Sequence, residues 1–137
     1  MKAVVIGCGR TGSEVAKGLA EAGWEVTVVD ESEDALARLA PWRGEFVVGH
    51  GMDAAVLDQA RVGDADAAVV STDGDNTNIV IGQVLRQRYE IPEVVVRVLD
   101  PRRAAFYAER GMHTVCPTQT AISALVDAVV SSSRRTG

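Results

Sequence analysis

The chain has 137 residues, enough for one domain that buries roughly two-thirds of its unfolded surface without disulfide or metal support. Its 47% hydrophobic and 24% charged residues are ordinary for a soluble protein, and no apolar run approaches the roughly 18 residues of a membrane span. The net charge of -5 argues against nucleic-acid binding, which needs clustered Lys and Arg. With no secretion signal at the N-terminus, we expect a cytoplasmic protein without direct membrane insertion.

Short β-branched runs alternate with helical stretches along the chain. Strands are expected over residues 2–6, 25–29, 45–48, 67–71, 93–99 and 113–116. Helices are expected over residues 11–22, 32–40, 54–60, 75–89, 102–110 and 118–132. Ser32 and Asp53 are expected to cap the second and third of these helices.

The strand cores are continuously apolar, which is typical of strands buried on both faces. The sequence therefore predicts an α/β fold: a doubly wound, parallel six-stranded, Rossmann-like sheet in the order 3-2-1-4-5-6. We expect residues 1–133 to form one nucleotide-binding domain and residues 134–137 to be a tail or truncated linker.

A glycine-rich turn, Gly7-Cys8-Gly9-Arg10-Thr11-Gly12, links the first strand to the first helix and matches G-x-G-x-x-G. Gly7 permits the tight turn, Gly9 allows a phosphate to approach the backbone, and Gly12 allows close packing of the helix on the strand. Free amides at the helix N-terminus then face the phosphates. The alternative is a tight turn that binds no ligand.

Asp30 ends the second strand, about 20 residues beyond the loop, where a ribose-binding acid belongs in this fold. A carboxylate there, reinforced by Glu31, would repel a 2′-phosphate and favour NAD over NADP. Arg10 is expected to reach a phosphate, although it could also be a solvated surface residue. Asp30 could equally be an ordinary acid that precedes a helix.

Further polar residues follow the later strands, and ligands of open α/β sheets bind at the carboxyl ends of strands. We expect them to complete the nucleotide site, although His50 could be a plain loop residue, and Thr72 and Asp73 could simply cap the following helix. These candidates are His50, Gly51, Met52, Ser71, Thr72, Asp73, Asn78 and Arg97.

The chain resembles the N-terminal nucleotide-binding domain of regulators of potassium conductance, the TrkA-N or KTN family. The resemblance is carried by the Gly7–Gly12 turn with Arg10, Asp30, the Gly49–Asp53 turn, Thr72-Asp73-Gly74-Asp75 with Asn78, Arg97, and Gly111 through Cys116-Pro117. It implies that Arg10 contacts a phosphate and Asp30 the ribose, and that the domain binds NAD(H), AMP, ADP or ATP. Thr118, where the family often has an acid, favours NAD(H), AMP or ADP over ATP.

The resemblance further implies a nucleotide-sensing regulatory subunit that gates an integral-membrane potassium channel or transporter at the inner face of the plasma membrane. An alternative is a small NAD-dependent oxidoreductase, which the sequence disfavours because the sheet and its helices leave no room for a substrate pocket. A third hypothesis is an assembly module that binds no ligand. We therefore expect no catalytic residues and no metal site.

The last predicted helix carries one apolar stripe, Ile122, Leu125, Val126, Val129 and Val130. The default expectation is that this stripe packs on the protein's own sheet. The resemblance suggests instead that the helix, or the neighbouring Phe106-Tyr107, joins a second subunit in a homodimer or a higher ring.

Overall fold

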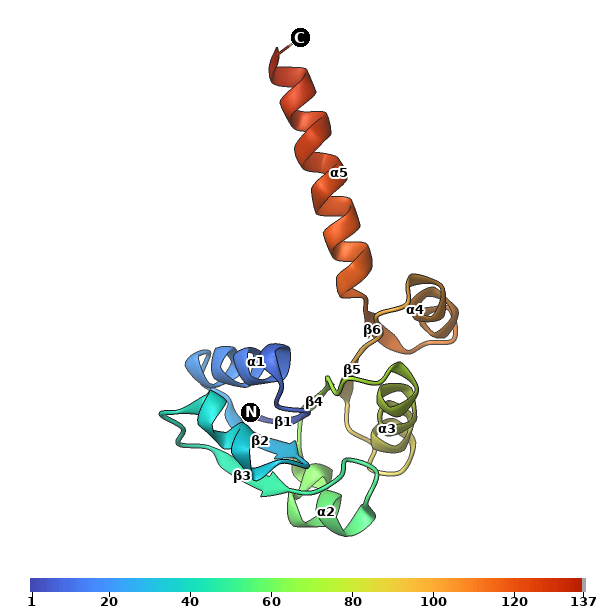
Figure 1. Cartoon of the computed structure of the whole chain (residues 1–137). Helices are drawn as coiled ribbons and strands as arrows, with labels where there is room; N and C mark the ends of the chain where they lie inside the picture. Colours follow the sequence, from blue (N-terminus) through green and yellow to red (C-terminus); the bar gives the residue numbers. More distant parts are fainter. Residues whose placement is uncertain (137) are drawn as a thin grey trace.

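The structure, a computed structural model, describes residues 1–136 and the side chains of residues 1–134. Six parallel strands form one sheet in the order β3-β2-β1-β4-β5-β6, with helices on both faces (Figure 1), as the sequence predicts. In chain order the elements are β1 (Lys2–Ile6), α1 (Arg10–Glu21), β2 (Glu25–Asp30), η1 (Glu33–Leu39), β3 (Glu45–Val48), α2 (Ala54–Gln59), η2 (Val62–Asp64), β4 (Ala67–Val70), α3 (Asp75–Gln87), β5 (Glu93–Arg97), α4 (Pro101–Ala108), β6 (His113–Val115) and α5 (Pro117–Thr136).

The register of the central strands brings their carboxyl ends to one edge of the sheet. Ile6 pairs with Val29 of β2 and with Val70 of β4. The next residue of each strand or loop is Gly7, Asp30 or Ser71, so three candidate site residues from distant parts of the sequence meet there.

Two apolar clusters hold the helices on the sheet. On one face α1 and η1 pack through Ala16, Ala35 and Leu39 against β-strand valines such as Val28. On the other face, residues of α2, α3 and α4 join a larger cluster that includes Leu85, which is fully buried. Both faces of β1 are covered, and this explains why the strand is apolar throughout.

Two elements differ from the sequence-based prediction because carboxylates capture backbone amides. Ser32 was expected to cap an α-helix, but its side chain makes no cap bond; its own N–H donates to Asp30 Oδ1 at 2.8 Å, and η1 is a 3₁₀-helix. The fifth strand ends at Arg97 rather than residue 99, because the amides of Leu99 and Asp100 donate to Asp75 at 2.8 and 3.1 Å. Asp53 caps α2 as predicted, accepting from the Ala55 amide.

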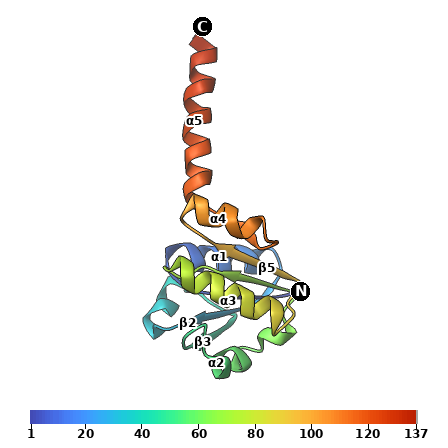
Figure 2. The same ribbon diagram turned by 90° about the vertical axis from the view of Figure 1, so that its right-hand side faces the viewer.

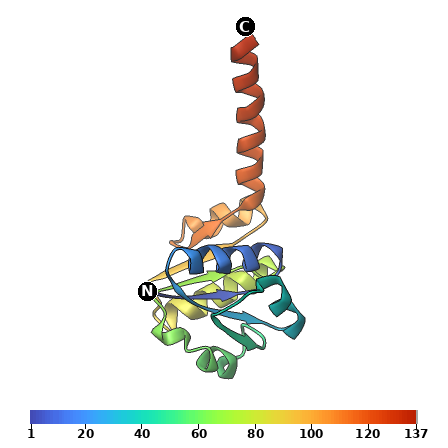
Figure 3. The ribbon, with the colours of Figure 1, turned by 90° about the vertical axis from the view of Figure 1, so that its left-hand side faces the viewer.

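The last helix departs most from expectation. Helix α5 leaves the edge of the sheet after β6 and projects away from the domain in all three views (Figures 1, 2 and 3). Its apolar stripe stays exposed, with 68% of Leu125 and 70% of Val129 accessible. The expectation that the stripe packs on the protein's own sheet is therefore wrong. Over residues 1–136, the structure has no helix with the length and apolarity needed to cross a membrane.

Candidate functional site

The glycine loop, residues Gly7–Gly12, has a backbone that only glycine tolerates at two of its positions. Gly7 has φ of +101°, and a Cβ there would lie 2.5 Å from the Ser71 carbonyl oxygen. A Cβ on Gly12 would collide with the carbonyl oxygen of Gly7. These contacts fix the start of α1 close to β1 and β4.

Gly9 differs from its neighbours because a Cβ there would meet nothing within 4 Å. Its φ of -79° is open to any residue, so neither packing nor backbone strain requires glycine here. The free space lies directly beside the amides that open α1. The backbone at Gly9 is therefore open to close approach from outside the protein.

The Asp30 carboxylate is held in place by backbone amides on both sides. Its Oδ2 accepts from the Cys8 N–H at 2.7 Å, and its Oδ1 from the Ser32 N–H at 2.8 Å. Each carboxylate oxygen has a second lone pair that can accept a sugar hydroxyl. The carboxylate is thus oriented beside the glycine loop and keeps acceptor capacity.

His50 and Glu31 form a polar pair at the same edge. His50 Nδ1 accepts from the Met52 N–H at 3.0 Å, which leaves the proton of a neutral imidazole on Nε2. Nε2 faces Glu31 Oε1 at 3.3 Å. The pair joins the loop after β3 to the loop after β2.

Asn78 organises the loop after β4. Its amide Nδ2 donates to the carbonyls of Thr72 and Arg97 at 3.1 and 3.0 Å, and its Oδ1 accepts from the Thr72 N–H at 2.9 Å. The Thr72 hydroxyl also donates to this oxygen. Arg97 in turn donates to the Thr72 carbonyl. Asn78 is 1% exposed, so its contacts are with the protein, and they fix Thr72 at the site.

These loops enclose a cavity of about 380 Å³ at the carboxyl ends of the strands, within the range of nucleotide-sized sites. We call it the carboxyl-end cavity. The predicted site residues that line it are Gly7, Cys8, Gly9, Asp30, Glu31, His50, Gly51, Ser71, Thr72 and Asp73.

Six predicted site residues do not line the cavity. Arg10 and Thr11 are exposed at the start of α1, and Gly12 is buried behind the loop. Met52 is exposed on the loop after β3. Asn78 and Arg97 lie behind the Thr72 loop.

The lining also includes residues that the sequence analysis missed, among them Arg38 of η1 and Thr77 of α3. Arg38 follows Ala35 by three residues, and the Ala35 carbonyl lies 3.6 Å from the Cys8 thiol. This spacing of three residues places Arg38 on the same face of η1 as Ala35, and it was the signal in the sequence that could have identified Arg38. The signal is useful only when η1 is known to face the glycine loop.

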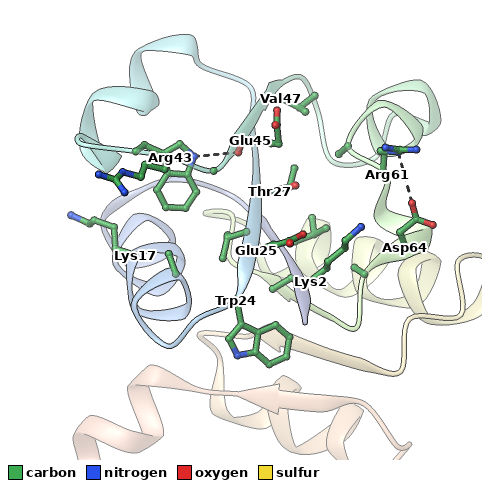
Figure 4. A pocket seen from close by; sticks show the side chains of 18 of the residues that line it. Lys2, Lys17, Trp24, Glu25, Thr27, Arg43, Glu45, Val47, Arg61 and Asp64 are labelled. Carbon is green, nitrogen blue, oxygen red and sulfur yellow. Dashed lines mark hydrogen bonds and ion pairs between the residues drawn. The ribbon is translucent and has the colours of Figure 1, made fainter.

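A larger hollow of about 1060 Å³ lies at the opposite, amino-terminal ends of β1, β2 and β3 (Figure 4). Side chains of both signs line it, including Lys2, Glu25 and the ion pair of Arg61 with Asp64 at 3.8 Å. The glycine loop Gly7–Gly12 and the N-terminus of α1 are not among its walls. Since ligands of open α/β sheets bind at carboxyl ends, we place the functional site at the smaller cavity.

The residues of the carboxyl-end cavity fit an adenine nucleotide. The space at Gly9 is open beside the N-terminus of α1, which is where phosphates bind in this type of fold, and the Asp30 carboxylate keeps acceptor lone pairs of the kind that a sugar hydroxyl needs. The Ser71 hydroxyl is buried and has no hydrogen-bond partner among the described residues. Within residues 1–136, no group of three or more His, Cys, Asp or Glu side chains is placed to hold a metal ion.

Cys8 lies in the glycine loop but is not poised for redox chemistry. Burial raises the pKa of its thiol above 9.0, and the negative charge of Asp30 raises it further. The thiol is fully buried and donates to the Ala35 carbonyl. A low-pKa, accessible thiol is what reactive cysteines need. Cys8 is therefore a packing residue of the loop.

Comparison with known proteins agrees with this fold. Residues 3–118 match the TrkA-N domain family. The Trk system potassium uptake protein TrkA of Streptomyces coelicolor is 37% identical over 116 residues, which cover 84% of this chain and 52% of that protein. The chain thus spans about half the length of this relative.

Solved structures share the fold at lower identity. The TrkA-N domain of the inner membrane protein ybaL from Escherichia coli superposes with a TM-score of 0.82 at 18% identity, over 93% of this chain and 95% of that one. The Kef CTD of Shewanella denitrificans in its AMP-bound form superposes with a TM-score of 0.77 at 21% identity, over 95% of this chain and 80% of that one. Because the family match covers most of its length, the chain belongs to the TrkA-N domain family.

Proposed function

We propose that this domain is the nucleotide-sensing part of a regulator of potassium transport. It binds NAD(H) or a simple adenine nucleotide, AMP, ADP or ATP, in the carboxyl-end cavity. The observation that carries the proposal is the juxtaposition of the open glycine loop at Gly9 with the oriented carboxylate of Asp30. The relatives' name, potassium uptake protein, supports the transport role.

Different residues of the cavity bind different parts of the nucleotide. The amides after Gly9 receive the phosphate, assisted by the positive end of the α1 dipole. Asp30 accepts hydrogen bonds from the ribose hydroxyls. Thr72 and Ser71, on the loop that Asn78 holds, face the second half of a dinucleotide. Arg10, exposed beside this site, folds over the outer phosphate when a ligand is present.

We propose sensing rather than catalysis, although the Rossmann fold also serves oxidoreductases. Asp30 and His50 are two of the titratable side chains that line the cavity. Both are already engaged by backbone amides, of Cys8 and Ser32 in the first case and Met52 in the second. These contacts suit a fixed binding surface. A turnover assay with NAD⁺ and a panel of alcohols tests this directly, and specific hydride transfer would contradict it.

The binding test compares Gly9, the N-cap residue of α1, with Gly18 inside that helix. Gly9→Ala places a methyl where a phosphate must approach, yet meets no protein atom within 4 Å. Gly18→Ala is the matched control, because a Cβ there also meets nothing within 4 Å and the residue does not line the cavity. Isothermal titration with NAD⁺, NADH, AMP, ADP and ATP should show binding to wild type and Gly18→Ala, with at least a tenfold loss in Gly9→Ala. Equal affinity of all three proteins for every ligand would contradict the proposed site.

We propose that the domain forms a homodimer through α5. The stripe on α5 is exposed, and so is Val115 of β6, at 44%. Val95 of β5 is only half-buried, because none of the helices within residues 1–136 packs on the β5–β6 part of the sheet on the α1 side. An exposed apolar helix and an incompletely covered sheet face are complementary surfaces on two copies of one chain.

Light scattering tests the dimer. Wild type should give about twice the 14.5 kDa of one chain. Leu125→Glu with Val129→Glu should give monomer while the far-ultraviolet circular dichroism of the sheet domain is kept. Monomeric wild type at about 100 μM, far above the Kd of stable interfaces, would contradict the proposal.

The membrane partner is tested in cells. Rubidium uptake should depend on the gene for this chain. Gly9→Ala, at equal protein levels, should abolish the change in uptake that follows a change in the cellular level of NAD(H) or of the adenine nucleotides. Uptake that is indifferent to loss of the gene would refute the role in transport.

A further inference from the structure

Arg38 brings a positive charge to the carboxyl-end cavity from an unexpected element. It lies on η1, and its side chain lines the cavity. Its one hydrogen bond in the structure is from Nη1 to the Cys8 carbonyl, at 3.4 Å, near the limit for such a bond. The guanidinium carries five N–H donors, so most of its donor capacity is available to a ligand.

Arg38 and Asp30 both hydrogen-bond to the backbone of Cys8, on the two successive peptide units that meet at this residue. Asp30 Oδ2 accepts from the N–H of Cys8, and Arg38 donates to the C=O of Cys8. The charges of both residues also act on the pKa of the Cys8 thiol, which Asp30 raises and Arg38 lowers. Arg38 thus adjoins the place where Asp30 would hold a sugar, and lies on the η1 side of it.

The other charged residues of the cavity indicate what Arg38 can bind. The lining of the cavity contains three carboxylates, those of Asp30, Glu31 and Asp73. Among the described residues that line it, Arg38 is the only Arg or Lys. A guanidinium next to a sugar-binding carboxylate matches a ligand with an anionic substituent on that sugar, because Arg binds phosphate through paired donors.

We propose that Arg38 is a specificity-determining residue that binds a phosphate on the 2′ oxygen of the adenosine ribose, so that the cavity accepts 2′-phosphorylated adenine nucleotides as well as unmodified ones. The proposal rests on the proposed nucleotide site and deepens it. It revises the expectation, based on Asp30 and Glu31 alone, that a 2′-phosphate is rejected. Asp30 favours the free hydroxyl, and Arg38 offsets its repulsion of the phosphate.

The test compares two ligands that differ by this one group: AMP and adenosine 2′,5′-bisphosphate. Wild type should bind both within about tenfold of each other. Arg38→Ala should weaken the bisphosphate about tenfold relative to AMP, the order expected for one charge-assisted phosphate contact, and Arg38→Lys should recover part of the loss. NAD⁺ and NADP⁺ should follow the same pattern.

Arg43→Ala is the matched control, because Arg43 is an exposed arginine of the same connection and lines the opposite hollow. It should leave the affinity ratio of the two ligands unchanged. Thermal unfolding of each variant confirms that the fold is intact.

Three results would overturn the inference. Equal weakening of both ligands in Arg38→Ala would place Arg38 at the base or the 5′-phosphate. No change in either would make it a surface residue. Binding of AMP without any binding of the bisphosphate to wild type would show that Asp30 prevails. Failure of wild type to bind any of the four ligands would instead remove the proposed nucleotide site itself.

Discussion

Replacing Asp30 by alanine should destabilise the protein even when no nucleotide is present. The carboxylate accepts from two backbone amides, those of Cys8 and Ser32, at 2.7 and 2.8 Å. The Cys8 amide is partly buried, and its loss of a charged acceptor costs about 1.5 kcal/mol. The Ser32 amide is exposed, so water replaces most of its bond and the cost is about 0.5 kcal/mol. The expected loss is about 2 kcal/mol.

Urea unfolding followed by circular dichroism measures this loss, and the thermal midpoint should fall by about 8 °C for a domain of this size. Asp30→Asn should lose about half as much, because an amide side chain keeps one carbonyl acceptor. Glu31→Ala is the control, since this adjacent carboxylate contacts only His50 and is 70% exposed. It should change stability by less than about 0.5 kcal/mol.

The reasoning fails if Asp30→Ala is as stable as Glu31→Ala. In that case the Cys8 and Ser32 amides form hydrogen bonds to water that are as favourable as those to the carboxylate. If Asp30→Ala then still binds nucleotide more weakly, the loss of affinity comes from lost contacts to the nucleotide and not from a less stable loop.

Four further predictions concern the packing and the two cysteines. Asn78→Ala should lose about 3 kcal/mol in urea unfolding, because the partly buried backbone groups of Thr72 and Arg97 lose three hydrogen bonds to a buried side chain. The exposed Asn76→Ala should lose less than about 0.5 kcal/mol. Gly82→Ala should destabilise by about 1–2 kcal/mol, since its Cβ would lie 2.5 Å from Val96 Cγ2; adding Val96→Ala should relieve that overlap, and a purely additive double variant would contradict this. Iodoacetamide at pH 8 should label Cys116 in the native protein and leave Cys8 unmodified; rapid labelling of both would refute the burial. Because the folded-state pKa of Cys8 lies above its ordinary 9.0, the free energy of unfolding should fall as the pH rises past 9.

The sequence was sufficient for the strand order and for the position of the glycine loop, because continuous apolar runs and G-x-G-x-x-G are local signals. It was also sufficient for the Asp53 cap, which depends on residues two apart. The sequence could not show that Arg38 lines the cavity, because the direction of that side chain depends on how η1 is oriented against Cys8.

The direction of α5 could not be predicted from the sequence either. A stripe from Ile122 to Val130 shows that one face of a helix is apolar, but it does not say which surface covers that face. The early end of β5 has a similar cause. The amides of Leu99 and Asp100 are taken by Asp75, which is more than 20 residues away in the chain.

Because α5 projects from the domain, a small rotation at its base moves its far end a long way. Its 20 residues extend about 30 Å from a base at Pro117, where the contacts are few: the Cys116 thiol donates to the Leu99 carbonyl, and the Thr120 hydroxyl donates to the Cys116 carbonyl. A rotation of only about 10° at this base carries the tip about 5 Å. Sub-ångström shifts at the root of such a rod are therefore magnified at its far end into displacements as large as one helical turn.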